Sequence, residues 1–300
     1  MNRIKAAARR RLGVTDLEAR LAASKRQRAH AKSTLAELRA RHKEQGKEVR
    51  RLGRRLEHTQ ADMHSLLDLV AGNTELSPEV SRVLLHVTSR RLTMIRVPAL
   101  IEMCGIVADL KERGVEGSFL ETGTAMGGSA ILLTALKEPD RELAVYDVFG
   151  QIPPPTEADG EDVHQRYDTI VKGEAKGPGG SDYYGYQDDL LGKVAAAFTS
   201  AGYPVEDNRV RLVQGLFEDT LTPDGPVAFA HLDGDWYEST MVSLERVVPH
   251  LSVGGVLLVD DYHSWSGCAR AVDEFFAERA DFERVDGTRL RLVRTSAAQD

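Results

Sequence analysis

The sequence has few cysteines and no long apolar run. Only Cys104 and Cys268 occur in 300 residues, without C-x-x-C spacing, which argues against a disulfide framework or a thiolate metal site. No stretch stays apolar for the ~18 residues that a membrane-spanning helix needs. The start, MNRIKAAARRRLG, lacks the apolar core of a signal peptide. We therefore expect a soluble, cytoplasmic protein.

Residues 1–60 are poor in acidic side chains and contain no proline or aromatic residue. They hold 18 lysines and arginines against 6 aspartates and glutamates, whereas the whole chain has a net charge of −7. Alternating steps of four and three residues from Leu17 to Leu66 meet mostly apolar side chains, the spacing of a coiled-coil seam. We predict a basic helical arm over residues 1–70.

The arm has three candidate partners. We expect the first, a second copy of the chain, which would make a homo-oligomer through the coiled coil. The basic face could instead dock on an anionic membrane or on an acidic protein. Nucleic acid is not expected, because the arm lacks interleaved aromatic residues and the rest of the chain is strongly acidic.

Residues 71–300 alternate between short apolar runs and helical patterns. Helical stretches over residues 75–113 are followed by five strand–helix repeats, and the chain closes with a predicted strand pair around Asp286 and Gly287. This order predicts an α/β fold with a doubly wound, mostly parallel sheet, joined to the N-terminal helical arm.

Two pairs of aspartates directly follow apolar runs that are typical of buried parallel strands. Asp233 and Asp235 follow VAFAHL, and Asp260 and Asp261 follow GGVLLV. A helical stretch links the two runs, so they form a β–α–β unit with parallel strands. If these strands are neighbours, the carboxylates share one edge of the sheet and repel one another unless a cation neutralises them. The sequence therefore predicts a hard-metal site at this edge.

A glycine-rich turn, ETGTAMGGS, follows the first predicted strand. Gly123, Gly127 and Gly128 would let the chain turn tightly and a ligand approach the backbone. The dinucleotide pattern G-x-G-x-x-G is absent. Glu121 before the turn suits the cationic groups of S-adenosylmethionine better than a pyrophosphate, and Asp147 after the second strand is placed to bind ribose hydroxyls. By itself, the turn is also consistent with a plain strand-to-helix connection.

Several segments, taken in order, resemble the macrocin O-methyltransferase family. They are ETGTAMGGSA, YDVFGQIPPP, GLFEDTL, HLDGDWYEST, LSVGGVLLVDDY and GCARAVDEFF, within roughly residues 75–295. Members of that family are class I enzymes that use S-adenosylmethionine to methylate sugar hydroxyls on natural products. The resemblance implies a Rossmann-like methyltransferase domain over residues 71–300 and does not cover the arm.

The resemblance also implies roles for individual residues. It places the ligands of a divalent metal, usually Mg²⁺, at Asp233, Asp260 and Asp261, and a general base at Asp235. Leu216 stands where the family often has an aromatic residue beside the adenine. The candidate cofactor-binding residues are Glu121, Gly123, Thr124, Gly127, Gly128, Ser129, Asp147, Gly215 and Phe217.

Methyl transfer to an alcohol needs the acceptor oxygen held in line and relieved of its proton. A metal bound to two adjacent hydroxyls would do both, and Asp235 could accept the proton. His263 is a second candidate catalytic residue, whereas His231 lies in a strand and is expected to be a hydrogen-bonded core residue. The insertion over residues 151–189 carries three consecutive prolines and a YYGY cluster, which favours a lid over a surface excursion or a dimer contact.

The predicted activity is methylation of a sugar hydroxyl on a glycosylated natural product or glycan. Two alternatives stay open. A catechol or phenol methyltransferase would use the same geometry, although such enzymes typically carry Asp–Asn where this chain has Asp260 and Asp261. The second alternative is a scaffold that the arm tethers to a membrane or complex.

Overall fold

The computed structural model describes residue 5 and residues 14–72 and 76–297, with side chains described for residues 5, 17–54 and 76–297. The chain divides into two compact units, residues 1–61 and 62–300. Helix α2 (Val14–Gly72) accounts for most of the first unit and continues past the division. Its alanines, leucines, arginines, lysines and glutamates are strong helix formers, which outweigh the internal Gly46 and Gly53. None of the described helices combines the length and apolar character of a bilayer-spanning segment.

The second unit is built on a seven-stranded sheet with the order β3-β2-β1-β4-β5-β7-β6. The five strands β1 to β5 pair in parallel, while β7 runs antiparallel to both β5 and β6. The predicted mostly parallel sheet with a terminal strand pair is therefore confirmed. The strands are β1 (Ser118–Thr122), β2 (Leu143–Asp147), β3 (Val210–Gln214), β4 (Val227–Leu232), β5 (Leu251–Val259), β6 (Phe282–Asp286) and β7 (Leu290–Arg294).

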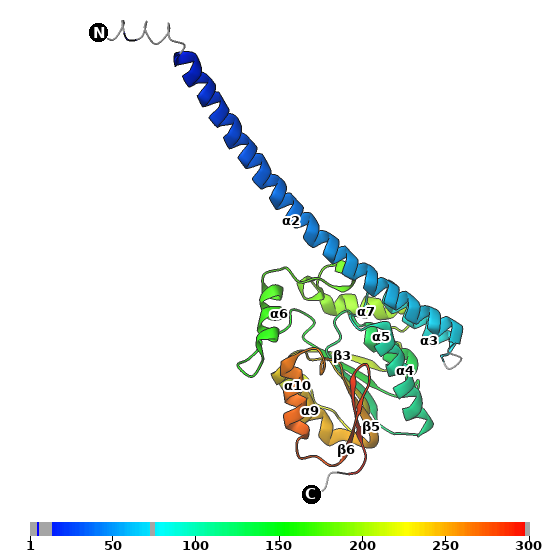
Figure 1. Cartoon of the computed structure of the whole chain (residues 1–300). Helices are drawn as coiled ribbons and strands as arrows, with labels where there is room; N and C mark the ends of the chain where they lie inside the picture. The colour runs from blue at the N-terminus through cyan, green and yellow to red at the C-terminus, as the bar shows by residue number, and fades with distance from the viewer. Residues whose placement is uncertain (1–4, 6–13, 73–75, 298–300) are drawn as a thin grey trace. The chain divides into compact units, whose positions relative to one another are not determined.

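Helices cover both faces of this sheet (Figure 1). Phe119 of β1 packs into a core with the helices of one face, and the next residue, Leu120, packs into a core with the helices of the other, as strand alternation requires. The first face carries α3 (Pro78–Ser89), α4 (Val97–Glu112), α5 (Gly128–Leu136) and α7 (Leu190–Ala201), and the second carries α8 (Phe217–Thr220), α9 (Tyr237–Val247) and α10 (Ser266–Phe276).

The insertion over residues 151–189 has secondary structure of its own. It contains α6 (Glu161–Val171) and two short 3-10 helices, η1 (Pro178–Gly180) and η2 (Tyr184–Tyr186). Two further 3-10 turns, η3 (Val205–Asp207) and η4 (Val248–His250), precede β3 and β5.

The parallel strands bring the candidate residues to one edge of the sheet. The carboxyl ends of β1, β2, β4 and β5 are neighbours, because these four strands are adjacent and parallel. The register sets Glu121 of β1 beside His231 of β4, and Leu232 of β4 beside Val259 of β5. The residues at the carboxyl ends of these four strands therefore lie along one edge of the sheet, as the sequence predicts.

Candidate functional site

Two buried carboxylates hold the glycine-rich turn after β1. Asp147 Oδ2 accepts hydrogen bonds from the backbone N–H groups of Thr124 at 2.7 Å and Ala125 at 3.3 Å, and its Oδ1 accepts one from Phe149 at 2.6 Å. Glu121 Oε2 accepts the Thr124 hydroxyl at 2.7 Å. Burial raises the pKa of Asp147, and the backbone donors oppose that rise. Three of the roughly four lone-pair sites of Asp147 are thus used, and one is left for a ligand.

The turn requires glycine because other backbone lies against it. Gly123 has a φ of 79°, and a Cβ there would lie 1.8 Å from the Asp233 carbonyl oxygen. A Cβ on Gly128 would lie 2.6 Å from the Leu92 carbonyl oxygen, and Gly127, the N-cap residue before α5, has a φ of 85°. Only glycine fits such contacts and dihedrals without displacing the backbone. The turn and the segment after β4 are therefore packed together.

Three carboxylates converge beyond β4 and β5. One oxygen each of Asp233, Asp235 and Asp261 lies within 4.8 Å of the others. Asp235 has a φ of 59°, its N–H donates to Asp261 Oδ2 at 3.2 Å, and its Oδ1 accepts the Trp265 indole N–H at 2.9 Å. A left-handed conformation is uncommon for a residue other than glycine, and here it turns Asp235 back towards the other two carboxylates.

The convergence perturbs the acidity of all three groups. Burial, followed by the charges of neighbouring aspartates, raises the pKa of Asp233 and of Asp261 well above the usual value. Burial also raises the pKa of Asp235, to about 6, although the Trp265 hydrogen bond opposes it. Such shifts mark carboxylates whose charge lacks compensation, a common property of functional sites.

Asp260 has different surroundings from its neighbour Asp261. Its Oδ1 accepts Arg289 Nε at 2.5 Å and lies 3.5 Å from His231 Nε2. Burial alone would raise the pKa of Asp260, but His231 and Arg289 bring it below its usual value. The structure therefore gathers Asp235 with Asp233 and Asp261, and it turns Asp260 towards cations. The assignment of Asp260 as a metal ligand and Asp235 as a base stays a prediction.

His231 is a fully buried, hydrogen-bonded residue, as expected for its place in β4. Its Nδ1 lies 2.8 Å from Glu121 Oε1. Burial alone would lower the pKa of His231, but Asp260 and Glu121 raise it to about 9. His263, in contrast, is exposed and stacks edge-on against Tyr262, with the ring centroids 5.1 Å apart. It lines neither of the clefts described next.

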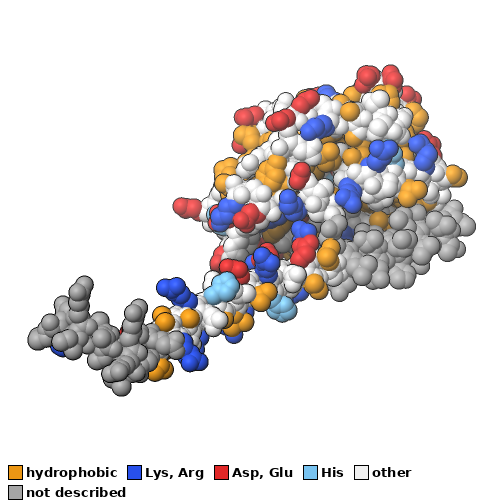
Figure 2. Space-filling model, turned by 90° about the horizontal axis from the view of Figure 1, so that it is seen from above, with side chains coloured by type: hydrophobic (Ala, Val, Ile, Leu, Met, Phe, Trp, Pro, Cys, Tyr) orange, Lys and Arg blue, Asp and Glu red, His pale blue; other side chains and the backbone are white. Residues whose placement is uncertain are grey.

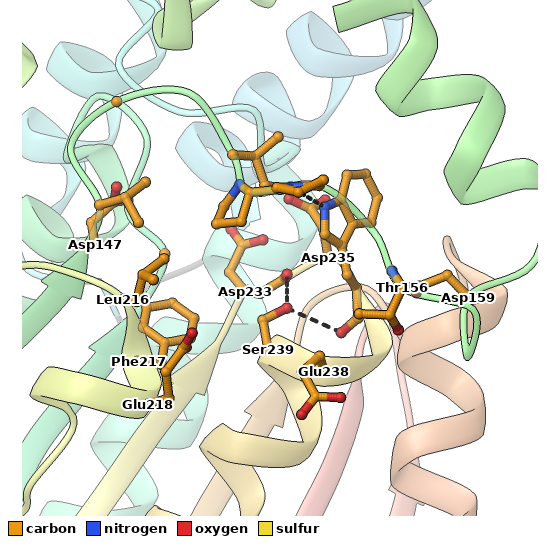
Figure 3. A pocket seen from close by; sticks show the side chains of 18 of the residues that line it. Asp147, Thr156, Asp159, Leu216, Phe217, Glu218, Asp233, Asp235, Glu238 and Ser239 are labelled. Carbon is orange, nitrogen blue, oxygen red and sulfur yellow. Dashed lines mark hydrogen bonds between the residues drawn. The ribbon is translucent and has the colours of Figure 1, made fainter. Parts of the chain in front are cut away.

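A cleft of about 330 Å³ opens between the turn and α8. We call it the Phe217 cleft. In Figure 3, Leu216, Phe217 and Glu218 lie on the side of Asp147, while Asp233 and Asp235 lie between them and Asp159. Phe217 is the first residue of α8, and Gly215 before it has a φ of 152°. The volume of the Phe217 cleft is within the range of small-molecule sites.

A second cleft, of about 420 Å³, adjoins the first. We call it the Arg289 cleft. The two clefts share Gly123, Asp147, Tyr184 and the segment Asp233–Trp236 in part, so they meet at the carboxylates. The remaining walls of the Arg289 cleft include Thr124, Ser129, Arg166, Lys176, Tyr183, Asp260, Asp261, Trp265 and Arg289.

The insertion forms part of the wall of both clefts and is tied to two helix starts. Asp159 Oδ1 accepts the N–H of Tyr237, the first residue of α9, at 2.8 Å. Asp162 Oδ2 accepts the N–H of Ser266, the first residue of α10, at 3.0 Å. Acidic side chains at helix N-termini stabilise those helices. Tyr184, further along the insertion, lines both clefts.

Sequence reasoning missed Arg289 and Arg166. Arg289 comes from the connection between β6 and β7, 29 positions after Asp260, and no motif marks it. Arg166 comes from α6 of the insertion, with its guanidinium 5.6 Å from the centre of the Tyr183 ring. The YYGY cluster was the one signal in the sequence that pointed to this part of the wall.

The domain that holds both clefts is similar to known O-methyltransferases. A family model described as macrocin O-methyltransferase (TylF) matches residues 74–290. Demethyldecarbamoylnovobiocin O-methyltransferase of Streptomyces niveus is 33% identical over 210 residues, covering 65% of this chain and 70% of that protein. The 8-demethyl-8-(2,3-dimethoxy-alpha-L-rhamnosyl)-tetracenomycin-C 4'-O-methyltransferase of Streptomyces olivaceus is 32% identical over 215 residues, covering 69% and 77%.

Solved structures agree with this similarity. The O-methyltransferase NovP matches with a TM-score of 0.55 and 26% identity, over 80% of this chain and 100% of that chain. The calicheamicin methyltransferase CalS11 matches with a TM-score of 0.52 and 20% identity, over 80% and 91%, which supports the fold alone.

Proposed function

Because the chain belongs to the macrocin O-methyltransferase family and is an S-adenosylmethionine-dependent O-methyltransferase, we propose that its acceptor is a sugar hydroxyl of a glycosylated natural product or glycan. The relative from Streptomyces olivaceus is named for a rhamnosyl-tetracenomycin substrate. The cluster of Asp233, Asp235 and Asp261 beside the glycine-rich turn supports the methyl-transfer chemistry. The observation that carries the sugar acceptor is Asp261, which stands where catechol enzymes typically have asparagine.

The donor fits the Phe217 cleft. Leu216 and Phe217 supply apolar surface for an adenine, and the free lone-pair site of Asp147 can accept a ribose hydroxyl. The methionine end would then lie at Gly123 and Thr124, close to the carboxylates. This orientation directs the methyl group from the Phe217 cleft towards the Arg289 cleft, where we place the acceptor.

The donor atoms of the carboxylate cluster suit a hard divalent cation such as Mg²⁺, because all are oxygens. Their raised pKa values fit the same conclusion, since a bound cation would offset both the burial and the mutual repulsion that raise them. Asp233 and Asp261 would hold it, with either Asp260 or Asp235 as the third ligand. When bound, a divalent metal supplies Lewis-acid activation and orientation of an acceptor diol.

The remaining chemistry belongs to side chains. With a pKa of about 6, Asp235 is largely ionised at neutral pH and can take the proton of the acceptor hydroxyl. The Trp265 indole fixes its orientation through Oδ1. Tyr184 and Trp236, which line both clefts, exclude water from the space between donor and acceptor.

The test is a methyl-transfer screen with the full chain, S-adenosylmethionine and matched panels of glycosides and catechols, read by mass spectrometry. We expect methylated glycosides, and loss of turnover in EDTA with recovery on adding Mg²⁺. Full activity in EDTA would remove the metal from the mechanism. Turnover of catechols but of no glycoside would overturn the proposed acceptor.

A further inference from the structure

Helix α2 carries an apolar seam that the family resemblance does not explain. Among residues 17–54, where the side chains of α2 are described, the large apolar ones are between 47% and 67% exposed. They keep a single heptad register over five heptads, without a skip, as a two-stranded coiled coil requires. We call this set the arm seam: Leu17, Leu21, Ser24, Arg28, Ala31, Leu35, Leu38, His42, Gln45, Val49 and Leu52.

The borders of the arm seam are cationic. The residues that flank it, in the positions that form interhelical ion pairs, include five cations and two anions. Figure 2 shows lysine and arginine side chains beside hydrophobic ones along the described part of the arm. The flanking charged residues are Glu18, Arg20, Lys25, Lys32, Arg39, Arg41 and Glu48.

These charges disfavour a second copy paired in parallel and in register along the arm seam. In a parallel, in-register pair, Arg28 would face Arg28 of the other copy in the seam, and His42 would face His42. Arg20 would face Lys25 of the other copy across the border, and no border pair would join opposite charges. Like charges at these positions destabilise pairing and specify against it.

A membrane surface fits less well than a helix. Helices that lie in a membrane interface present a broad apolar face, commonly with tryptophan or phenylalanine. The arm seam is only two residues wide per heptad, and residues 1–75 contain no aromatic residue.

We propose that the arm seam binds an acidic amphipathic helix of another protein as a coiled coil. This docking would recruit the methyltransferase to an assembly and is independent of its chemistry.

The test uses the full chain and two labelled helical peptides of five heptads. Both carry leucine at the seam positions; one has glutamate at every border position, and the other has lysine. We expect the acidic peptide to bind with an affinity that falls at least tenfold between 50 and 500 mM salt, and the basic peptide not to bind. The leucine-to-aspartate pair L35D/L38D should abolish binding.

Matched charge reversals separate border from bulk charge. The triple variant K25E/K32E/R39E reverses border charges, and R26E/K47E/R54E reverses the same number on the opposite face of α2. The first should lose affinity at least tenfold, and the second should lose less than threefold. Equal losses would overturn the proposal. So would a stable dimer of the full chain by light scattering that excludes the peptide, or seam-dependent binding to phosphatidylglycerol vesicles without peptide binding.

A separate observation concerns His231, which lies between Glu121 and Asp260 and whose side chain hydrogen-bonds only Glu121, since its buried Nε2 has no hydrogen-bond partner among the described residues. The register sets Glu121 of β1 and Leu258 of β5 on either side of His231, and Asp260, two residues after Leu258, lies just beyond the end of β5 on the same face. His231 Nδ1 lies 2.8 Å from Glu121 Oε1, and its Nε2 lies 3.5 Å from Asp260 Oδ1. Glu121 also holds the Thr124 hydroxyl of the turn at 2.7 Å.

These three residues contact both sites of the proposed function. Glu121 accepts a hydrogen bond from Thr124 of the glycine-rich turn, and Asp260 directly precedes Asp261 of the carboxylate cluster. We infer that His231 is a positioning residue through which donor binding and metal binding strengthen each other. The inference rests on the proposed function. By linkage, the coupling must be equal in both directions.

The test is calorimetric binding of S-adenosylhomocysteine and Mg²⁺ to the full chain, each with and without the other. We expect at least threefold mutual tightening in the wild type. H231L should keep each separate affinity within threefold and lose the tightening. H231N, whose amide can still reach Glu121, should keep the affinity for S-adenosylhomocysteine alone closest to wild type.

The outcomes distinguish the inference from the proposed function. A wild-type protein that binds Mg²⁺ and S-adenosylhomocysteine without coupling would overturn the role of His231 alone. Coupling that persists in a folded H231L variant would do the same. A wild type that binds no divalent metal would overturn the metal mechanism, and the coupling with it.

Discussion

The carboxylates at the two halves of the sheet edge differ in their hydrogen-bond partners. After β1 and β2, both oxygens of Glu121 and of Asp147 have hydrogen-bond partners within the protein. After β4 and β5, Asp233, Asp235 and Asp261 chiefly face one another. All five lie at or just beyond the carboxyl end of an apolar strand, so position alone does not separate them. The hydrogen-bond donors around them do: those around Glu121 and Asp147 fix the turn, whereas the second group, Asp233, Asp235 and Asp261, has fewer, and we place the proposed cation within it.

The largest expected effect removes a member of the second group. Asp233→Ala or Asp261→Ala should lower kcat by about a thousandfold, because a metal that activates the acceptor supplies several kcal/mol and each 1.36 kcal/mol is tenfold in rate. Calorimetry should show lost Mg²⁺ binding and retained binding of S-adenosylhomocysteine. Asp140→Asn, on an exposed loop, is the control. If both variants kept Mg²⁺ affinity, the contrast between the two halves would fail.

A smaller loss is expected at Asp235, where the two assignments of the cluster diverge. As a base, Asp235 would contribute about a hundredfold to kcat, so Asp235→Asn should lose that rate while keeping Mg²⁺ affinity. The matched variant Asp260→Asn should then lose Mg²⁺ affinity. The reverse result, lost affinity in Asp235→Asn and normal affinity in Asp260→Asn, would make Asp235 the third ligand and leave the base elsewhere.

At the glycine-rich turn, an added methyl group should weaken binding of the methyl donor. Gly123→Ala sets a Cβ against the Asp233 carbonyl oxygen at a positive φ, and the strain should displace the turn. We expect donor affinity to fall by about 30-fold, since displacing a well-fitted contact costs about 2 kcal/mol. Gly225→Ala, where a Cβ would meet nothing within 4 Å, should bind the donor normally. Unchanged donor affinity in Gly123→Ala would place the cofactor elsewhere.

Local patterns predicted much of this edge, and long-range packing decided the rest. Apolar runs that end in acidic residues gave the strands and the side of the sheet that matters, and the glycines gave the turn. Asp260 and Asp261 are consecutive, however, and side chains along a strand alternate between faces. Asp260 thus shares the face of His231, where Arg289 reaches it from the β6–β7 connection. No spacing in the sequence indicates that contact, so the sequence alone did not distinguish the two aspartates.

The smallest expected effect is a pH dependence of stability that belongs to the second group. The pKa of Asp235 is about 6 in the folded protein and about 4 in an unfolded chain. Between these values the folded state binds more protons, so the free energy of unfolding decreases as pH rises. In EDTA, the melting temperature should fall by a few degrees from pH 4.5 to 6.0, a range below the usual pKa of histidine. Asp235→Asn should flatten this dependence of the melting temperature on pH. Saturating Mg²⁺ should raise the melting temperature at pH 6.0 and so make the fall smaller. A wild-type slope that Asp235→Asn leaves unchanged would show that it does not arise from the raised pKa of Asp235.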